Sequence, residues 1–148
     1  KGRPSAWSAT VDRLASDYDG NGQFPRLFVL CAGNTEDAQT WDTYPAGLGT
    51  RGIRDPGQAW NALTVGAYTE KVNITEADAQ GYVPVAPEGG VSPYSRTSNG
   101  WNSAWPLKPD VVLFGEFLEA SGCCLCVTSE ICREVVFAPE ARPRERSE

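Results

Sequence analysis

The sequence RLFVLCAGN, residues 26–34, decides the fold because an apolar run ends there in small residues and one amide. A continuous run of roughly five or six apolar residues has the length of a strand that is covered on both faces. Ala32 and Gly33 leave room for a ligand to approach the backbone, and Asn34 adds a side-chain NH2. Such a group can donate to an oxygen that gains negative charge during a reaction. The stretch therefore predicts a buried strand that ends at a functional site.

The residues before this stretch predict an amphipathic helix that ends near residue 16. Ser5 is a capping candidate, and Trp7, Val11 and Leu14 follow it at the spacing of one helical face. We expect these three side chains to form the buried face.

The loop at residues 17–22, DYDGNG, begins like a calcium-binding loop. The twelfth position of that motif, which needs a bidentate Glu, is occupied by Phe28. We therefore predict a turn at this loop and no metal site.

Two more short apolar strands are predicted at residues 62–67 and 111–113. A long polar connection at residues 35–58 separates the first two strands, and residues 91–95 are compatible with a strand or a bend. A helix followed by apolar strands is typical of an α/β domain. We therefore expect a parallel sheet flanked by helices, in one incomplete domain.

The composition restricts the partners of this 148-residue chain. Its net charge of −6 argues against nucleic acid and against an anionic membrane surface. No apolar run approaches the roughly 20 residues of a membrane-spanning helix, and no signal peptide is visible, which favours a cytoplasmic location. The chain contains no Met and no His. Without His, it lacks the commonest general base. Without Met, it does not begin at an ordinary translation start, and we expect it to be a piece of a longer protein.

Three blocks, in order, carry a family resemblance: RLFVLCAGN at residues 26–34, DPGQAWNALTVGA at 55–67, and VSPYSRTS with WPLKPDVVLFG at 91–115. Together they resemble the central and C-terminal part of the catalytic domain of a subtilisin-like serine protease, a subtilase. The resemblance covers roughly residues 4–113.

This resemblance implies a serine endopeptidase that acts on polypeptides with a Ser-His-Asp triad and needs no cofactor. Asn34 matches the family's asparagine that helps to bind the oxyanion. Cys31, Ala32 and Gly33 match the segment that borders the pocket for the substrate side chain.

The chain also departs from the family pattern. The family's Asp and His precede the matched region, and the Gly-Thr-Ser nucleophile motif is absent. The most similar segment is VTSE at residues 127–130. Ser129 is therefore either a remnant nucleophile or an unrelated serine. We predict a partial subtilase-like domain at residues 1–113, and a divergent, poorly ordered tail at 114–148 whose last roughly 30 residues follow a different reading frame. The chain alone is expected to be inactive.

Two other functions remain open. One is a non-catalytic subtilase-like module that binds peptides or proteins in the same groove. The other is a zinc-binding adaptor built on Cys123, Cys124, Cys126 and Cys132, whose spacing fits no standard zinc knuckle. Free thiols are the alternative to zinc at these cysteines, and we predict no metal site.

Overall fold

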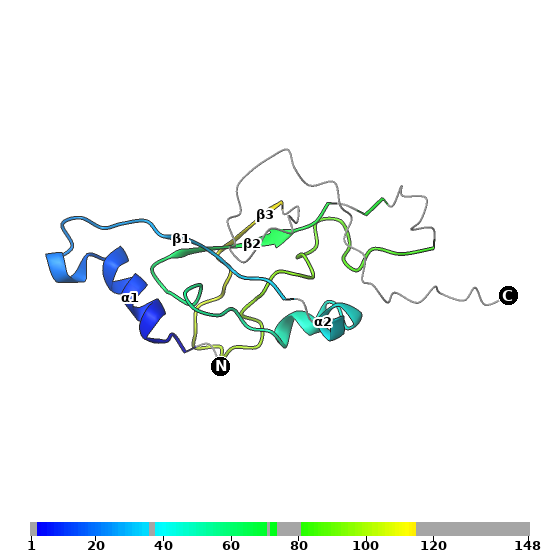
Figure 1. Cartoon of the computed structure of the whole chain (residues 1–148), viewed down its shortest axis with the longest axis horizontal. Helices are drawn as coiled ribbons and strands as arrows, with labels where there is room; N and C mark the ends of the chain where they lie inside the picture. The colour runs from blue at the N-terminus through cyan, green and yellow to red at the C-terminus, as the bar shows by residue number, and fades with distance from the viewer. Residues whose placement is uncertain (1–2, 36–37, 71, 74–80, 115–148) are drawn as a thin grey trace.

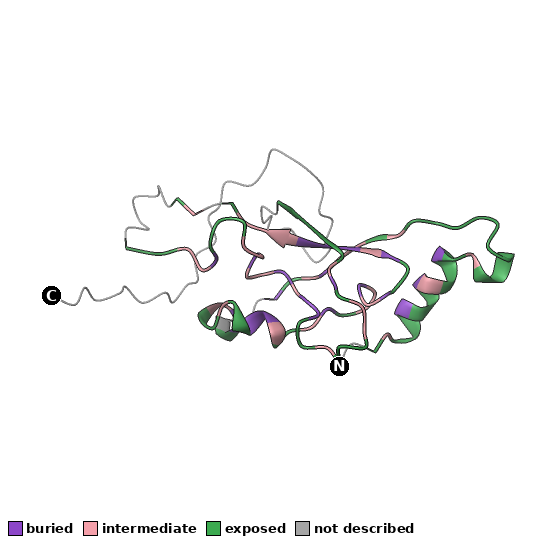
Figure 2. Ribbon diagram, turned by 180° about the vertical axis from the view of Figure 1, so that it is seen from behind, coloured by how far each residue is buried: buried purple, intermediate pink, exposed green. Residues whose placement is uncertain are grey.

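A computed structural model describes residues 3–35, 38–70, 72–73 and 81–114. Its elements, in chain order, are α1 (Ala6–Ala15), η1 (Tyr18–Gly20), β1 (Val29–Cys31), α2 (Ala38–Asp42), η2 (Ala46–Gly49), β2 (Leu63–Tyr68) and β3 (Val111–Phe114). In these residues the strands form one parallel sheet in the order β1-β2-β3. Helices α1 and α2 both lie below the strands in the two opposite views (Figure 1, Figure 2). The predicted α/β class with a parallel sheet is confirmed.

Helix α1 begins where the capping signal predicts. The backbone N–H of Trp7 donates to Ser5 Oγ at 3.1 Å, which satisfies one of the free amides of the first turn. At the other end, Asp17 adopts a left-handed conformation with φ 50°, directly after the C-cap Ser16. Local chemistry at both ends therefore determines the length of α1.

The predicted buried face of α1 is wrong for two of its three residues. Trp7 is 61% exposed and Leu14 is 45% exposed. The Oγ of Ser8, a fully buried residue, donates to the carboxylate of Asp55 and to the carbonyl oxygen of Pro56, and this polar contact turns the helix. The face that α1 buries consists of Ser8, Val11 and Ala15. Val11 belongs to a small core with Ala59 and Ala62, against which Phe28 and Leu30 pack.

Strand β1 is shorter and more exposed than the sequence predicts. Val29 is 59% exposed, whereas Leu30 and Cys31 are half-buried. Among the described residues, β1 forms one edge of the sheet, and both α-helices lie on one side of the strands (Figure 2). The expectation of a strand covered on both faces is therefore wrong for this part of the chain.

The polar connection at residues 35–58 contains two short helical segments that its Pro and Gly content concealed. Helix α2 follows the end of β1, and η2 follows α2. Leu48 and Ile53, from this connection, are almost fully buried. The connection is thus packed against the domain and contributes to its core.

Strand β2 lies at the centre of the sheet and pairs with both neighbours. Gly66 sits where Pro109 and Ser95 approach its backbone: a Cβ built there would lie 2.6 Å from Pro109 Cγ and 2.9 Å from Ser95 Oγ. A larger residue therefore does not fit, which gives the glycine of the NALTVGA block a physical reason.

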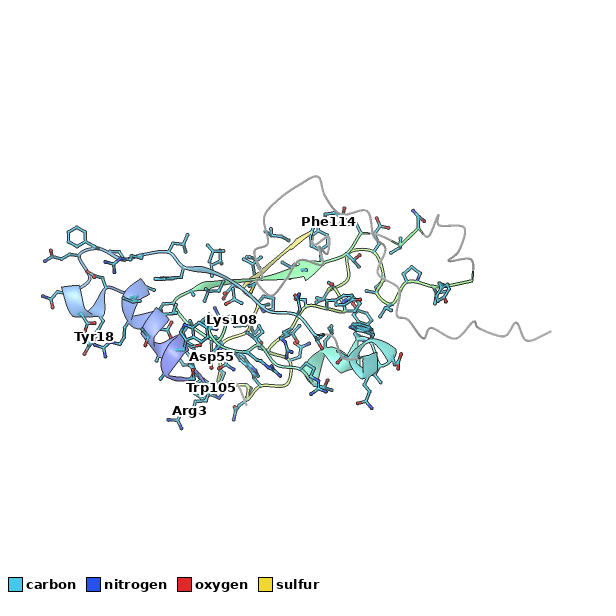
Figure 3. All side chains as sticks on the ribbon, in the orientation of Figure 1. Arg3, Tyr18, Asp55, Trp105, Lys108 and Phe114 are labelled. Carbon is cyan, nitrogen blue, oxygen red and sulfur yellow. The ribbon has the colours of Figure 1, made fainter. Side chains whose placement is uncertain are left out.

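A charge cluster made of the buried Lys108 and the partly exposed Asp110 joins the beginnings of β2 and β3. Lys108 Nζ donates to the carbonyl oxygen of Ala62 at 2.8 Å and to Asp110 Oδ2 at 2.6 Å. The same Oδ2 accepts the backbone N–H of Thr64 at 2.7 Å, and the N–H of Asp110 donates to the carbonyl oxygen of Thr64 at 2.8 Å. Figure 3 shows Lys108 and Asp55 in the middle of the molecule, beside α1. The KPD sequence thus holds two strands in register.

Removal of the Asp110 carboxylate should destabilise the fold strongly. The Lys108 side chain is only 1% exposed, so Asp110→Ala leaves a buried ammonium without its counter-charge. Breaking one side of a fully buried pair typically costs about 3–5 kcal/mol, and the 34% exposure of the Asp110 side chain should place the loss at the lower end of that range or below it. Urea unfolding followed by tryptophan fluorescence measures the loss. The control, Arg13→Ala, removes an ion pair whose side chains are 59% and 71% exposed, and should change stability by less than about 1 kcal/mol. Equal effects of the two variants would contradict the role of the charge cluster.

The four residues of β3 are all exposed by 40–57%. Figure 3 shows Phe114, the last residue of β3, above β2. Because β3 forms the second edge of the sheet among the described residues, its exposed apolar side chains lie on a strand of the kind that can pair with another chain.

We therefore expect the 148-residue chain to self-associate as its concentration rises. Leu113→Lys places a charge at the most exposed position of β3 and should shift the chain towards monomer without loss of helix or sheet. Sedimentation velocity measures the association, and far-UV circular dichroism checks the fold. A wild-type chain that stays monomeric at high concentration would contradict this expectation.

Candidate active site

The candidate site lies at the carboxyl end of β1, where the chain turns at Gly33. The N–H of Ala32 donates to the carbonyl oxygen of Val65 at 2.8 Å, so the pairing with β2 continues one residue beyond β1. Gly33 then adopts φ +86°, a conformation that favours glycine. Ala32 is buried and Asn34 is exposed. The turn therefore ends the strand with an amide side chain at the surface.

A distant segment pairs with this corner in an antiparallel bridge between Asn34 and Ser95. The N–H of Thr35 donates to the carbonyl oxygen of Tyr94 at 2.8 Å, and the N–H of Arg96 donates to the carbonyl oxygen of Gly33 at 3.1 Å. The segment at residues 94–96 thus contacts the backbone on both sides of Asn34. The predicted strand or bend at residues 91–95 is a bend that forms two isolated bridges, the other one between Tyr68 and Val91.

The side chain of Arg96 adds a second layer to this pairing. Its Nε donates to the carbonyl oxygen of Asn34 at 2.7 Å, and its NH1 nitrogen donates to that of Gly52 at 3.2 Å. A Cβ built on Gly33 would lie 3.3 Å from Cδ of Arg96, so the arginine stem lies against the corner. One guanidinium therefore joins the end of β1 to the connection between α2 and β2.

Arg96 has two other arginines, Arg51 and Arg54, as charged neighbours, and the acidic Glu36 and Asp37, which follow the corner in the sequence, lie outside the described residues. Burial lowers the pKa of Arg96, and repulsion from Arg54 and Arg51 lowers it further. The group stays protonated because an arginine titrates far above neutral pH.

Aromatic packing supports the corner from the side of α2. The rings of Trp41 and Tyr94 lie 4.7 Å apart at their centroids, with an angle of 51° between their planes.

Cys31 is a free thiol, and its carbonyl oxygen is 2.9 Å from a Cβ built on Gly57. The strip at residues 31–33 is therefore closely packed by backbone and small residues.

The described residues contain serines near acidic groups but no activated nucleophile. The hydroxyl of Ser8 is bound to Asp55, whose pKa is raised by burial but lowered more by hydrogen bonds from Ser8 and Ser5, so that the net shift is downward. A carboxylate with a lowered pKa is a weak base. Ser95 is buried, and its Oγ accepts the N–H of Ala67 at 3.2 Å. Since the sequence has no His, neither serine has an imidazole partner.

Several predicted groups are not described by the structure. Ser129 and the cysteines at residues 123–132 lie outside the described residues, as does the tail at 115–148. In the part of the chain that is described, no group of three or more His, Cys, Asp or Glu is placed to hold a metal ion. No helix of that part combines the length and the apolar character needed to cross a membrane.

The comparison with family models decides the relationship. The model of the subtilase family, Peptidase_S8, matches residues 1–137. The chain belongs to the subtilase family. No curated protein and no solved structure gave a significant match. Subtilases are serine peptidases, so the activity at the level of the family is hydrolysis of polypeptides.

The structure places the subtilase blocks together in space. The first block ends at the corner, the second forms β2, and the third supplies both the bend that pairs with the corner and strand β3. The predicted site residues Cys31, Ala32, Gly33 and Asn34 form the end of the first block. Their roles in oxyanion and substrate binding remain predictions.

The sequence reasoning did not identify Arg96 as a site residue. Its contacts with Asn34 and Gly52 span 62 and 44 residues of chain, and no local spacing pattern reports such a distance. The available signal was the position of Arg96 directly after the SPYS turn of the third block.

Gly33→Ala should destabilise the protein more than a glycine substitution with the same backbone conformation. A residue with a Cβ in a left-handed conformation typically costs about 1–2 kcal/mol, and here the added Cβ also meets Arg96. Gly81 is the matched control, because it has φ +93° but nothing within 4 Å of a built Cβ. Urea unfolding of both variants separates backbone strain from contact. Equal losses of stability would show that the corner is not packed against Arg96.

Proposed function

We propose that this chain supplies the oxyanion-binding corner and the adjacent substrate strip of a subtilisin-like serine endopeptidase. Attack of a serine hydroxyl on the scissile carbonyl carbon concentrates negative charge on the carbonyl oxygen. In this proposal the side-chain NH2 of Asn34 donates a hydrogen bond to that oxygen. Cys31, Ala32 and Gly33 border the pocket for the substrate side chain.

The observation that supports this proposal most is the way Asn34 is presented. Its side chain is exposed at the end of a sheet strand, whereas the backbone on both sides of it is hydrogen-bonded to residues 94–96. A donor that is already in place when charge develops stabilises a transition state better than one that must first reorient.

The 148-residue chain alone is proposed to be inactive. It contains no His, and so no imidazole can accept the proton of an attacking serine. An oxyanion donor accelerates the reaction only where a nucleophile and a bound substrate are present. We propose further that residues 1–113 form the subtilase-like unit and that residues 114–148 form a divergent tail, of which the family model still matches residues 114–137.

The alternative function is a non-catalytic subtilase-like module that binds peptides at the same corner. The absence of His favours it if the gene encodes no catalytic residues beyond this chain. A fluorophosphonate probe, which phosphonylates an activated serine with loss of fluoride, distinguishes the two functions. The full-length product of the gene should be labelled if it is a peptidase. An unlabelled but folded product would support the binding module.

Asn34→Ala in that full-length product should lower kcat by about 10²–10³ with little change in KM, which is the loss known from subtilisin itself when such a donor is removed. Asn61→Ala is the matched control, because Asn61 is an exposed asparagine just before β2. Peptide hydrolysis at several substrate concentrations separates kcat from KM. An unchanged kcat for Asn34→Ala in an active enzyme would exclude the proposed oxyanion role.

A further inference from the structure

We propose that Arg96 is a positioning residue for Asn34: its guanidinium holds the peptide group after Asn34 and thereby aims the side-chain amide. This inference rests on the proposed role of Asn34 as an oxyanion donor. It assigns to Arg96 a function that acts through Asn34 and does not require contact with the substrate.

The direction of the Asn34 side chain depends on the two peptide groups that flank its Cα atom. The peptide group before it is held through the carbonyl oxygen of Gly33, which accepts the N–H of Arg96. The peptide group after it is held at both ends: its N–H, from Thr35, donates to Tyr94, and its carbonyl oxygen accepts Arg96 Nε at 2.7 Å. With both peptide groups held, φ and ψ of Asn34 are restricted, and so is its Cα–Cβ bond.

Only one of these hydrogen bonds comes from a side chain. The bonds from the N–H groups of Arg96 and Thr35 are made by backbone atoms, and a substitution of either side chain leaves those donors in the chain. The bond from Arg96 Nε is the one that mutation removes directly. It is also the shortest of the three.

The guanidinium is itself held in place from a second direction. Its NH1 nitrogen donates to the carbonyl oxygen of Gly52, and Thr97 pairs with Gly52 in a parallel bridge. Thr97 Oγ1 donates to the carbonyl oxygen of Leu48 at 3.1 Å and is buried there. The connection between α2 and β2 therefore holds the guanidinium of Arg96 through the carbonyl oxygen of Gly52.

This geometry requires arginine rather than any positive side chain. A guanidinium presents Nε and NH1 donors in one rigid plane, which lets it reach two carbonyl oxygens on different segments at once. An ammonium has its three donors on one atom and a flexible stem, so Lys at this position retains the charge but not both contacts. Arg96→Lys therefore separates charge from geometry.

The test uses the full-length product of the gene and compares Arg96→Met, Arg96→Lys and Arg54→Met. A displacement of a catalytic group by about 1 Å can reduce the rate about 10²-fold, so we expect Arg96→Met to lower kcat by about 10- to 100-fold with little change in KM. Arg96→Lys should be only partly active. Arg54→Met removes a neighbouring positive charge without contact to the corner and should have a much smaller effect. Equal losses for Arg96→Met and Arg54→Met would overturn the proposal in favour of a charge effect.

A double-mutant cycle with Asn34→Ala ties the effect to Asn34. If Arg96 acts through Asn34, Arg96→Met should cause little further loss of kcat once Asn34 is already Ala. Additive losses in an enzyme that is slowed by Asn34→Ala overturn the positioning role and leave the oxyanion role intact. If the single substitution Asn34→Ala leaves kcat unchanged, the oxyanion role itself is overturned. The two failures are therefore distinguishable.

A measurement that needs no activity completes the test. Hydrogen exchange, followed by mass spectrometry, reports on the amides of Asn34 and Thr35 in the same proteins. Arg96→Met should speed exchange in the peptide that carries these amides, because the bond from Thr35 to Tyr94 opens more often when its peptide group is released. Arg54→Met should leave the exchange unchanged. Equal exchange in wild type and Arg96→Met would overturn the proposal even in a protein without peptidase activity.

Discussion

The hydrogen bonds between the corner at residues 33–35 and the bend at 94–96 are the constraint on which the rest of the candidate site depends. They bring two segments together that are separated by about 60 residues of chain, and they do so directly beside the end of the sheet. Arg96 extends the same contact to Gly52, so the connection between β1 and β2 is also held. Without this pairing, Asn34 would stand on an unsupported loop, where no direction of its side chain is favoured.

The sheet is secured at its other end by a different charged residue. Lys108 and Asp110 join the start of β2 to the start of β3 through hydrogen bonds with Ala62 and Thr64, of which the bond from Lys108 to Ala62 is buried. Arg96 and Lys108 come from the same stretch of chain, and each donates to backbone carbonyl oxygens. In both places a cation satisfies peptide oxygens that the parallel ladder leaves free. The third subtilase block therefore supplies a cation at each end of the described sheet.

Local signals predicted much of the fold. The cap at Ser5 determined the start of α1, and the apolar runs located all three described strands to within a few residues. The faces of these elements were predicted less well. Trp7 and Leu14 are exposed because a buried contact between Ser8 and Asp55 turns the helix, and no apolar periodicity reports a polar contact across 47 residues.

The candidate site was also predicted in part, since adjacent residues were recognised and long-range contacts were not. The small residues and the amide of the corner were visible in the sequence, because they are adjacent in it. The support of the corner was not, since it is made by Arg96, Gly52 and Tyr94 through long-range contacts with backbone atoms. Such contacts depend on the path of the chain rather than on the type of the accepting residue, and any residue can offer a carbonyl oxygen.

In the proposed function, hydrogen bonds from residues 94–96 hold Asn34 in position to donate to a developing oxyanion. The most direct measurement is a crystal structure of the full-length protein with a peptide aldehyde bound covalently to its catalytic serine, which mimics the tetrahedral intermediate. We predict that Asn34 Nδ2 lies about 2.7–3.1 Å from the hemiacetal oxygen, with the guanidinium of Arg96 still bound to the carbonyl oxygen of Asn34. A separation beyond about 3.5 Å, with the oxygen bound by other donors, would contradict the account.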